Sequence, residues 1–305
     1  MTTSMPDPLT SPGIHLSGEA LMGLRHLARR GVSPSTRTLA GLPGGIVTRK
    51  RGRGSEPDDV RLWSEGDDRR HIDRNATART GILHVRTHHD ERDRAVVLMA
   101  DFRPSMLFGT RRALRSVAAA EALALLGWRI VGDGGRIGLI AATAGEPVVV
   151  RPSGGERAMT AVTGALAHAH AGALDAPSRE DPPLGPALDV AGSLLPSGGH
   201  LVLASALDAP GPDFESGLTA LAERFSISLL VVSDAFERVR PAGFYPFATP
   251  DGRRGTITAG RAAIASDVDE RLGTLRRLGL QGLRIDAEAG PESYAPLMER
   301  LDAML

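Results

Sequence analysis

The 305-residue sequence contains no cysteine, which excludes disulfide bonds and thiolate chemistry. Aromatic residues make up only 4% of the chain, whereas hydrophobic residues make up 42%. A sizeable core is therefore expected, built from Ala, Leu, Val and Ile. Lys50 is the only lysine, and the 36 basic residues are balanced by 36 acidic ones. A chain without net charge has no overall electrostatic attraction for nucleic acid or for an acidic membrane.

The sequence also lacks recognisable targeting and transmembrane segments. Its first twelve residues are polar and proline-rich, without the basic and then apolar stretches of a signal peptide. The most apolar long stretch, residues 117–130, is too short to span a bilayer and is interrupted by Glu121 and Arg129. We therefore expect a cytoplasmic protein, in agreement with the absence of cysteine.

From residue 95 onwards, short apolar runs alternate with segments of helical periodicity. The run Ala95–Ala100 is apolar throughout and ends at Asp101, a pattern typical of a strand buried on both faces. Further strands are expected at 136–142, 147–150, 200–205, 226–233 and 283–285, and helices at 111–128, 157–171, 184–194, 214–224, 262–278 and 292–304. This alternation has the spacing of βαβ units and predicts an α/β fold with a doubly wound, mainly parallel sheet.

The two ends of the chain have different patterns. Ser17 is expected to cap a helix over 18–30, a Gly- and Pro-rich segment with short strands follows, and 82–87 reads as a strand. Near the other end, Asp251-Gly252 is a strong turn signal that predicts a hairpin within 243–260. We divide the chain into a disordered lead-in (1–16), an N-terminal helix with accessory strands (17–93), a central α/β core (94–240), and a C-terminal hairpin, strand and helices (241–305).

Polar residues stand where the buried strands end. In parallel sheets, ligands bind beyond the carboxyl ends of the strands, and those ends carry Asp101, Ser205 and Asp234. The segment Asp101-Phe-Arg-Pro-Ser105 combines a carboxylate with a hydroxyl, which are oxygen ligands of the kind that Mg²⁺ takes. Alternatively, Asp101 caps the turn that follows it. The spacing alone leaves both interpretations open.

Several separate motifs resemble those of one family. They are Arg51-Gly-Arg-Gly, Val60-Arg61, Glu65-Gly-Asp-Asp68, Arg70, Ile72-Asp73, Thr77-Ala-Arg79, Val85-Arg86, Glu91-Arg92, Asp101, Ser105-Met-x-Phe108-Gly-Thr110 and Asp234-Ala-Phe-Glu237 with Pro241 and Gly243. Their order from about residue 51 to about 285 is similar to that of domain-of-unknown-function family 58 (DUF58), whose core is a von Willebrand factor A-type domain.

This resemblance implies both an architecture and a partner. It implies a von Willebrand A-type core over 94–240, with extra strands added by the preceding segment as an accessory β layer. It also implies partnership with a MoxR-type AAA+ ATPase, in pairs that act as chaperones in the maturation or assembly of other protein complexes. Metal- or quinone-dependent dehydrogenases are one such client, but nothing in these residues identifies the client.

The metal site that the resemblance implies is altered in this sequence. The usual site has an Asp-x-Ser-x-Ser loop, a Thr from a second loop and an Asp from a third. Asp101 and Ser105 match the first loop, but Arg103 replaces the middle Ser and cannot ligate a metal. The second loop, near Asp181-Pro-Pro-Leu-Gly185, has no Thr, and Ala206 stands at the Asp position with Asp208 nearby.

We therefore expect a degenerate site without a bound metal, in which Arg103 pairs with Asp101. If Mg²⁺ or Ca²⁺ does bind, the ligands predicted are Asp101, Ser105 and Asp208. The residues expected to receive a partner's side chain are Asp101, Arg103, Ser105, Ser205 and Asp208, with Arg103 attracting a carboxylate. The charged residues Glu65, Asp67, Asp68, Arg70, Asp73 and Arg79 form either a partner surface or an internal ion-pair network, and we favour the network.

The function predicted from these observations is that of a non-catalytic adaptor for an AAA+ ATPase, without a cofactor. One alternative is a protein-binding module that depends on a divalent metal. Another is a hydrolase that uses Asp101 or the carboxylates near Asp67, although no set of nucleophile, base and orienting group is evident. A third is nucleic-acid binding through Arg49–Arg53, which lacks interleaved aromatic residues.

Overall fold

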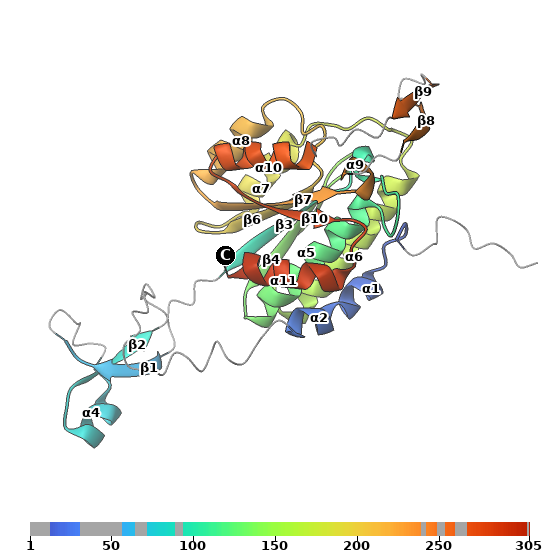
Figure 1. The fold of residues 1–305 in the computed structure, drawn as a ribbon. Helices are drawn as coiled ribbons and strands as arrows, with labels where there is room; N and C mark the ends of the chain where they lie inside the picture. The colour runs from blue at the N-terminus through green and yellow to red at the C-terminus, as the bar shows by residue number, and fades with distance from the viewer. Residues whose placement is uncertain are drawn as a thin grey trace, which may run out of the picture. The chain divides into compact units, whose positions relative to one another are not determined.

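The computed structural model describes residues 13–30, 57–64, 72–88, 94–238, 242–248, 254–259, 267–303 and 305. The chain divides into two compact units. One unit comprises residues 1–32 and 95–305, and the other comprises residues 33–94. Each unit is described by itself below, and Figure 1 shows the elements of both.

A six-stranded sheet forms the centre of the larger unit. Its strands are β3 (Ala95–Asp101), β4 (Arg136–Ala142), β5 (Val148–Gly154), β6 (His200–Ser205), β7 (Ser226–Ser233) and β10 (Gln281–Asp286). They lie in the order β10-β7-β6-β3-β4-β5, and all neighbours are parallel except the edge strand β5, which is antiparallel to β4. The prediction of a doubly wound, mainly parallel sheet is confirmed.

The strand order decides where a ligand site would lie. Numbered along the chain, the six strands follow the doubly wound order 3-2-1-4-5-6. The direction of winding therefore reverses between β3 and β6, which pair side by side with Ala100 opposite Ala204. In sheets of this kind, ligands bind at this switch point, beyond the carboxyl ends of the two strands. Asp101 and Ser205 end these two strands.

Helices cover both faces of the sheet. The elements on one face are α5 (Arg115–Gly132), α6 (Gly155–Asp175), α11 (Pro291–Asp302) and the N-terminal helices, and those on the other are α7 (Gly185–Leu194), α8 (Phe214–Ala222) and α10 (Asp267–Arg277). Side chains alternate along β3, so that Val96 and Leu98 join the first core while Val97 and Met99 join the second. Burial on both faces explains why this strand is apolar throughout.

The N-terminal helix differs from its prediction. Two short helices, α1 (Gly18–Gly23) and α2 (Arg25–Arg30), replace the single helix expected over 18–30, although Ser17 does cap the first. Both pack against the core, and the Trp128 indole donates a hydrogen bond of 3.3 Å to the Leu21 carbonyl. The chain is already ordered at 13–16, where Leu16 is buried. These helices therefore belong with the sheet, not with the accessory strands as the predicted boundaries had it.

The smaller unit contains β1 (Pro57–Leu62), α4 (Arg74–Thr80) and β2 (His84–His88). The two strands pair antiparallel in a two-stranded sheet of their own. The described strands thus do not pair with the central sheet, and their place as an accessory β layer of the fold stays a prediction. Each of the two strands forms its ladder hydrogen bonds with the other.

Two members of the predicted charged cluster lie in the smaller unit's described part. Asp73 caps α4 by accepting a hydrogen bond of 2.8 Å from the Ala76 backbone N–H, which is a structural role. Arg79 is exposed in the last turn of the same helix. The remaining members, Glu65, Asp67, Asp68 and Arg70, lie outside the described residues, so the choice between partner surface and ion-pair network stays a prediction.

The C-terminal elements follow the sequence pattern. Strands β8 (Gly243–Ala248) and β9 (Arg254–Ala259) form the predicted antiparallel hairpin, whose turn lies outside the described residues. The strand expected at 283–285 is the middle of β10, which pairs with β7. A short helix, α9 (Ala235–Arg238), follows β7 directly.

A buried histidine makes the stability of the core depend on pH. His170 of α6 is fully buried, with its Nε2 atom 2.9 Å from the Ser116 hydroxyl, and its Nδ1 atom has no hydrogen-bond partner among the described residues. Burial, with a smaller contribution from His15, lowers the pKa of His170 from 6.5 to about 4. The folded state therefore strongly favours the neutral ring.

We predict that replacing this histidine flattens the pH dependence of stability. Between pH 6.5 and 4 the His170 ring becomes protonated in the unfolded chain but stays largely neutral in the folded chain. The free energy of unfolding is therefore highest above pH 6.5 and decreases as the pH falls. At about 1.4 kcal/mol per pKa unit, the loss is about 3 kcal/mol. Urea unfolding over this range should show a shallower slope for His170→Gln. The exposed neighbour variant His168→Gln should keep the wild-type slope, and an unchanged slope for His170→Gln would contradict the prediction.

Candidate functional site

A buried ion pair fills the switch point of the sheet. Asp101 and Arg103 are 0% and 1% exposed. The Arg103 guanidinium donates from Nε to Asp101 Oδ1 and from Nη2 to Asp101 Oδ2, both at 2.9 Å, in a bidentate arrangement. The Ser205 hydroxyl donates to Asp101 Oδ2 at 2.6 Å. The predicted pairing of Arg103 with Asp101 is therefore confirmed.

The same guanidinium joins three loops. Arg103 Nη1 donates to the carbonyl oxygens of Pro182, at 2.7 Å, and Ala209, at 2.8 Å. The loop before α7 is held a second time, since Asp181 Oδ1 accepts a hydrogen bond of 2.9 Å from the Ser105 backbone N–H. One cation thus gathers oxygen atoms from the loops after β3, before α7 and after β6.

The residues present do not fit the divalent metal that the resemblance implies. The part of the chain that the structure describes contains no group of three or more His, Cys, Asp or Glu side chains arranged to hold a metal. Of the ligands predicted for that case, Asp101 binds Arg103 with both oxygens, and Asp208 binds two other arginines. A fixed guanidinium beside Asp101 repels a second cation.

The contact role predicted for Arg103 needs correction. Because it is almost completely buried and donates to four acceptor atoms, it does not offer its guanidinium to a partner's carboxylate in this structure. Asp101 and Ser205 are buried as well, so only Ser105 and Asp208 of the predicted binding residues reach the surface. Replacing this residue by a carboxylate, as in Arg103→Glu, would bring two carboxylates together in the interior and would disturb the fold along with any binding.

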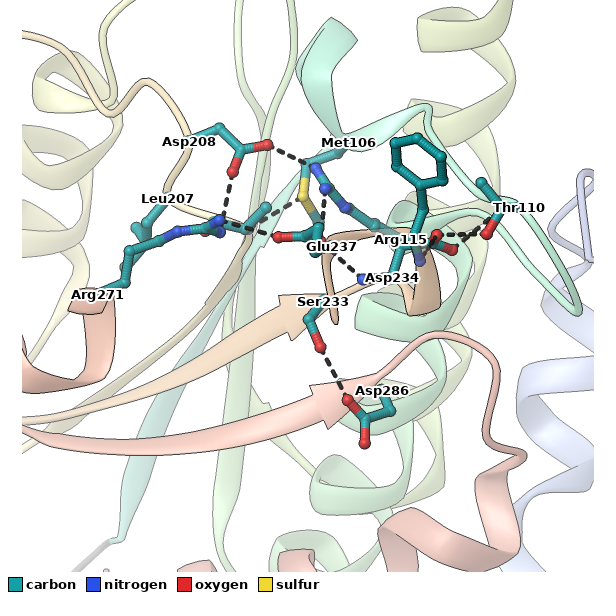
Figure 2. A network of polar contacts seen from close by, with 12 residues as sticks. Met106, Thr110, Arg115, Leu207, Asp208, Ser233, Asp234, Glu237, Arg271 and Asp286 are labelled. Atoms are coloured by element: carbon teal, nitrogen blue, oxygen red, sulfur yellow. Dashed lines mark hydrogen bonds and ion pairs between the residues drawn. The ribbon is translucent and has the colours of Figure 1, made fainter. Parts of the chain in front are cut away.

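A second set of ion pairs, drawn in Figure 2, lies at the same edge of the sheet. Arg115 donates to Asp208 at 2.5 Å and to Glu237 at 2.6 Å. Arg271 forms an ion pair with the other oxygen of Asp208 at 2.9 Å and donates to the other oxygen of Glu237 at 2.9 Å. The four side chains form a closed cycle, which we call the ion ring. It ties α5, the loop after β6, α9 and α10 together at the carboxyl edge of the sheet.

Hydrogen bonds of Asp234 fix the position of Glu237 in the ion ring. The Asp234 backbone N–H donates to Glu237 at 2.7 Å, while its carboxylate accepts from the backbone N–H and the hydroxyl of Thr110 and from the Phe236 N–H. Burial raises the pKa of Asp234, but these hydrogen bonds and the charge of Arg115 outweigh it, so the pKa lies below its usual value. Asp234 is therefore anionic at neutral pH.

The loop that carries Asp208 is held from both sides. The Leu207 backbone N–H donates to the Ser205 hydroxyl at 3.0 Å, Arg271 donates to the Ala206 carbonyl, and Arg103 holds Ala209. Leu207 adopts a positive φ of 58°, which is unfavourable for a side chain of this kind. The buried pair at Asp101 thus positions Asp208 through its neighbours.

An open groove of about 520 Å³ runs over the ion ring. It is lined by Pro104, Ser105, Leu107, Phe108, Arg115, Asp208, Phe236, Glu237 and Arg271. The rings of Phe108 and Phe236 meet edge to face at 6.3 Å, and the Arg115 guanidinium lies 5.0 Å from the centre of the Phe108 ring. Since Phe108 is 38% exposed, the groove presents an aromatic wall beside four charged groups.

Sequence reasoning missed most of the ion ring. Glu237 and Phe108 stood in the motifs that carried the family resemblance, but no role was assigned to either. Arg115 and Arg271 are helical arginines among many, and no local pattern distinguishes them. The signal available was the position of Asp234 and Glu237 after a buried strand, at the edge where ligands bind.

The fold and the site together define an α/β protein with a charged groove at the carboxyl edge of a mostly parallel sheet. The family described as "Protein of unknown function DUF58" matches residues 59–259. Because this match covers more than half of the chain, the protein belongs to the DUF58 family, as the sequence motifs predicted.

Individual relatives are distant or short matches. Uncharacterized proteins of Mycobacterium bovis (Mb1516) and Mycobacterium tuberculosis (Rv1480) are 37% identical over 91 residues, which is 30% of this chain and 29% of theirs. The matched segment thus spans less than a third of these relatives. Among solved structures, the conserved hypothetical protein BatB from Bacteroides thetaiotaomicron is 15% identical with a TM-score of 0.45, over 69% of this chain and 98% of that one.

A von Willebrand factor type A structure from Catenulispora acidiphila is also similar, at 14% identity and a TM-score of 0.42, over 69% of this chain and 42% of that one.

Within the described residues, no helix has the length and apolar character needed to cross a bilayer.

We predict that Arg103→Met destabilises the protein by about 3 to 5 kcal/mol, because it leaves Asp101 charged, buried and without its partner. The double variant Asp101→Asn with Arg103→Met should lose clearly less than the sum of the two single variants, since it no longer buries a lone charge. Urea unfolding measures all three.

The matched control is Arg179→Met, at an exposed arginine, which should change the unfolding free energy by less than about 0.5 kcal/mol. Additive effects of Asp101→Asn and Arg103→Met would contradict the coupling inferred from the bidentate geometry.

Proposed function

We propose that this protein is a non-catalytic protein-binding adaptor. It works in the cytoplasm with a MoxR-type AAA+ ATPase in the maturation or assembly of another protein complex, for which a metal- or quinone-dependent dehydrogenase is one candidate. Membership of the DUF58 family supports this proposal, through the partnership that the family resemblance implies. The observation that carries it is the carboxyl edge of the sheet, where Arg103 fills the ligand position and an open groove lies beside it.

The composition of the groove favours a protein as its ligand. Aromatic and arginine side chains are enriched where proteins bind one another, and the groove combines Phe108 and Phe236 with Arg115 and Arg271. Sites for small molecules are usually enclosed and mainly apolar, with few polar groups. This groove is open and charged, so it fits a protein surface better than a small substrate.

A hydrolase is less well supported by the same structure. The pair that most resembles a nucleophile and its base is Ser116 with His170, 2.9 Å apart. Both side chains are fully buried, and the second ring nitrogen of His170 has no hydrogen-bond partner among the described residues. A nucleophile needs access to substrate and a base oriented by a third group. This pair instead packs in the core against Phe102.

The test is affinity capture with the full chain from a native lysate, with and without ATP, read by mass spectrometry. We expect recovery of an AAA+ ATPase whose retention depends on nucleotide and is unchanged by EDTA. Phe108→Ala should weaken capture about tenfold, because an exposed aromatic at the centre of an interface contributes about 1.4 kcal/mol or more.

The control variant is Val149→Ala, at an exposed apolar side chain of the edge strand β5, which should leave capture unchanged. If no ATPase is recovered, the adaptor proposal fails. Capture of a different partner that EDTA abolishes would instead establish the metal-dependent binding module and would overturn the role assigned to Arg103.

A further inference from the structure

The ion ring is exposed at one member only. The Asp208 side chain is 32% exposed, whereas those of Arg115, Arg271 and Glu237 are 6%, 15% and 9% exposed. Asp208 is also the member that sits on a loop, while the other three lie on α5, α10 and α9. It is therefore the carboxylate that can leave the ion ring without unfolding a helix.

The loop conformation at Asp208 carries strain. A left-handed backbone conformation is unfavourable at a residue with a side chain beyond the β-carbon, and Leu207, next to Asp208, has a φ of 58°. The two ion pairs of Asp208 help to hold this conformation. Departure of Asp208 from the arginines removes two of the contacts that hold this conformation, so that part of the strain can relax and offset the loss of these contacts.

When Asp208 leaves, Arg115 and Arg271 each lose a carboxylate partner and require another hydrogen-bond acceptor. Arg115 is buried, its Nη atoms bind Asp208 and Glu237, and its Nε atom has no hydrogen-bond partner among the described residues. Arg271 binds Asp208 from the opposite side. Without Asp208, two guanidinium groups would face the groove with Glu237 as their shared carboxylate, leaving an excess of positive charge.

We propose that the groove binds an acidic segment of a partner protein, and that Asp208 is an internal stand-in that the partner's carboxylate displaces. The incoming Asp or Glu bridges Arg115 and Arg271 in place of Asp208, and an apolar side chain next to it packs on Phe108 and Phe236. This inference rests on the proposed adaptor function and names the chemistry of the segment that the adaptor recognises.

A basic segment fits the groove less well. Each oxygen of Asp208 is already paired with an arginine, so a partner's Lys or Arg would find no uncommitted carboxylate oxygen there. It would also lie beside two guanidinium groups, whose repulsion is strong in a partly buried site. A carboxylate meets two donors and restores the charge balance of the ion ring.

The experiment compares three peptides on the full chain by NMR titration: acetyl-Phe-Glu-Phe-amide, the same peptide with Gln in place of Glu, and the same peptide with Lys. The Glu peptide should bind tightest to the wild-type protein. Asp208→Asn removes the internal competitor and should tighten binding of the Glu peptide by at least about tenfold, without tightening the Gln peptide.

Two variants test the specificity of this effect. Asp189→Asn makes the same chemical change at an exposed position of α7 and should leave the affinity for the Glu peptide unchanged. Arg271→Gln, added to Asp208→Asn, should remove the gain, because it deletes one of the two guanidinium groups that hold the carboxylate.

A further variant keeps the inference falsifiable should circular dichroism show that Asp208→Asn does not fold. Leu207→Asn relieves the strain of the positive φ, holds Asp208 in place more firmly, and should weaken the Glu peptide about fivefold. Equal binding of the Glu and Gln peptides, or tighter binding of the Lys peptide, would overturn the inference. If the wild-type chain still captures the ATPase, the adaptor function survives that failure.

Discussion

The buried pair of Asp101 and Arg103 is the interaction on which the site depends. Two charges removed from water are stabilising only when their geometry is good and their remaining donors and acceptors are satisfied. Here the guanidinium binds both carboxylate oxygens and two backbone carbonyls, and the Ser205 hydroxyl completes Asp101. The pair therefore does more than join two residues that are close in sequence, because it attaches three loops to the edge of the sheet. Its loss would leave a lone buried charge and two carbonyls without their donor.

The topology of the sheet makes this fastening possible. Because winding reverses between β3 and β6, the connections leave these strands in opposite directions and open a crevice beyond their ends. In many doubly wound proteins the crevice receives a ligand. In this protein the side chain of Arg103, two residues after the end of β3, occupies the crevice. The ligand position is thus occupied by the chain itself, and the surface available for binding moves outward to the groove over the ion ring.

Local patterns predicted the parts of this structure that are determined locally. Strands β4, β6 and β7 have the bounds expected from their apolar runs, because strands buried on both faces leave a continuous signal. The pairing of Asp101 with Arg103 was also predictable, since the two residues are close in sequence. The ion ring was not, because Arg115 and Asp208 are 93 residues apart and no pattern joins them. The pairing of the accessory strands β1 and β2 with each other was not predictable for a related reason: a strand's own residues do not specify its pairing partner.

An arginine at the switch point responds to different conditions from a bound metal ion. A bound ion comes and goes with its concentration, whereas a guanidinium stays charged at every physiological pH. Arg103 therefore holds its carbonyl partners without depending on the concentration of an ion, and in our proposal the variable element lies one step outward, at the exposed Asp208. Its neighbours are fixed through Ser205 and Arg103, while its own bonds are made to two arginines in an open groove. Under our proposal, loops fixed by Arg103 carry one carboxylate that a partner can displace, and this arrangement suits the recognition of a negatively charged partner side chain.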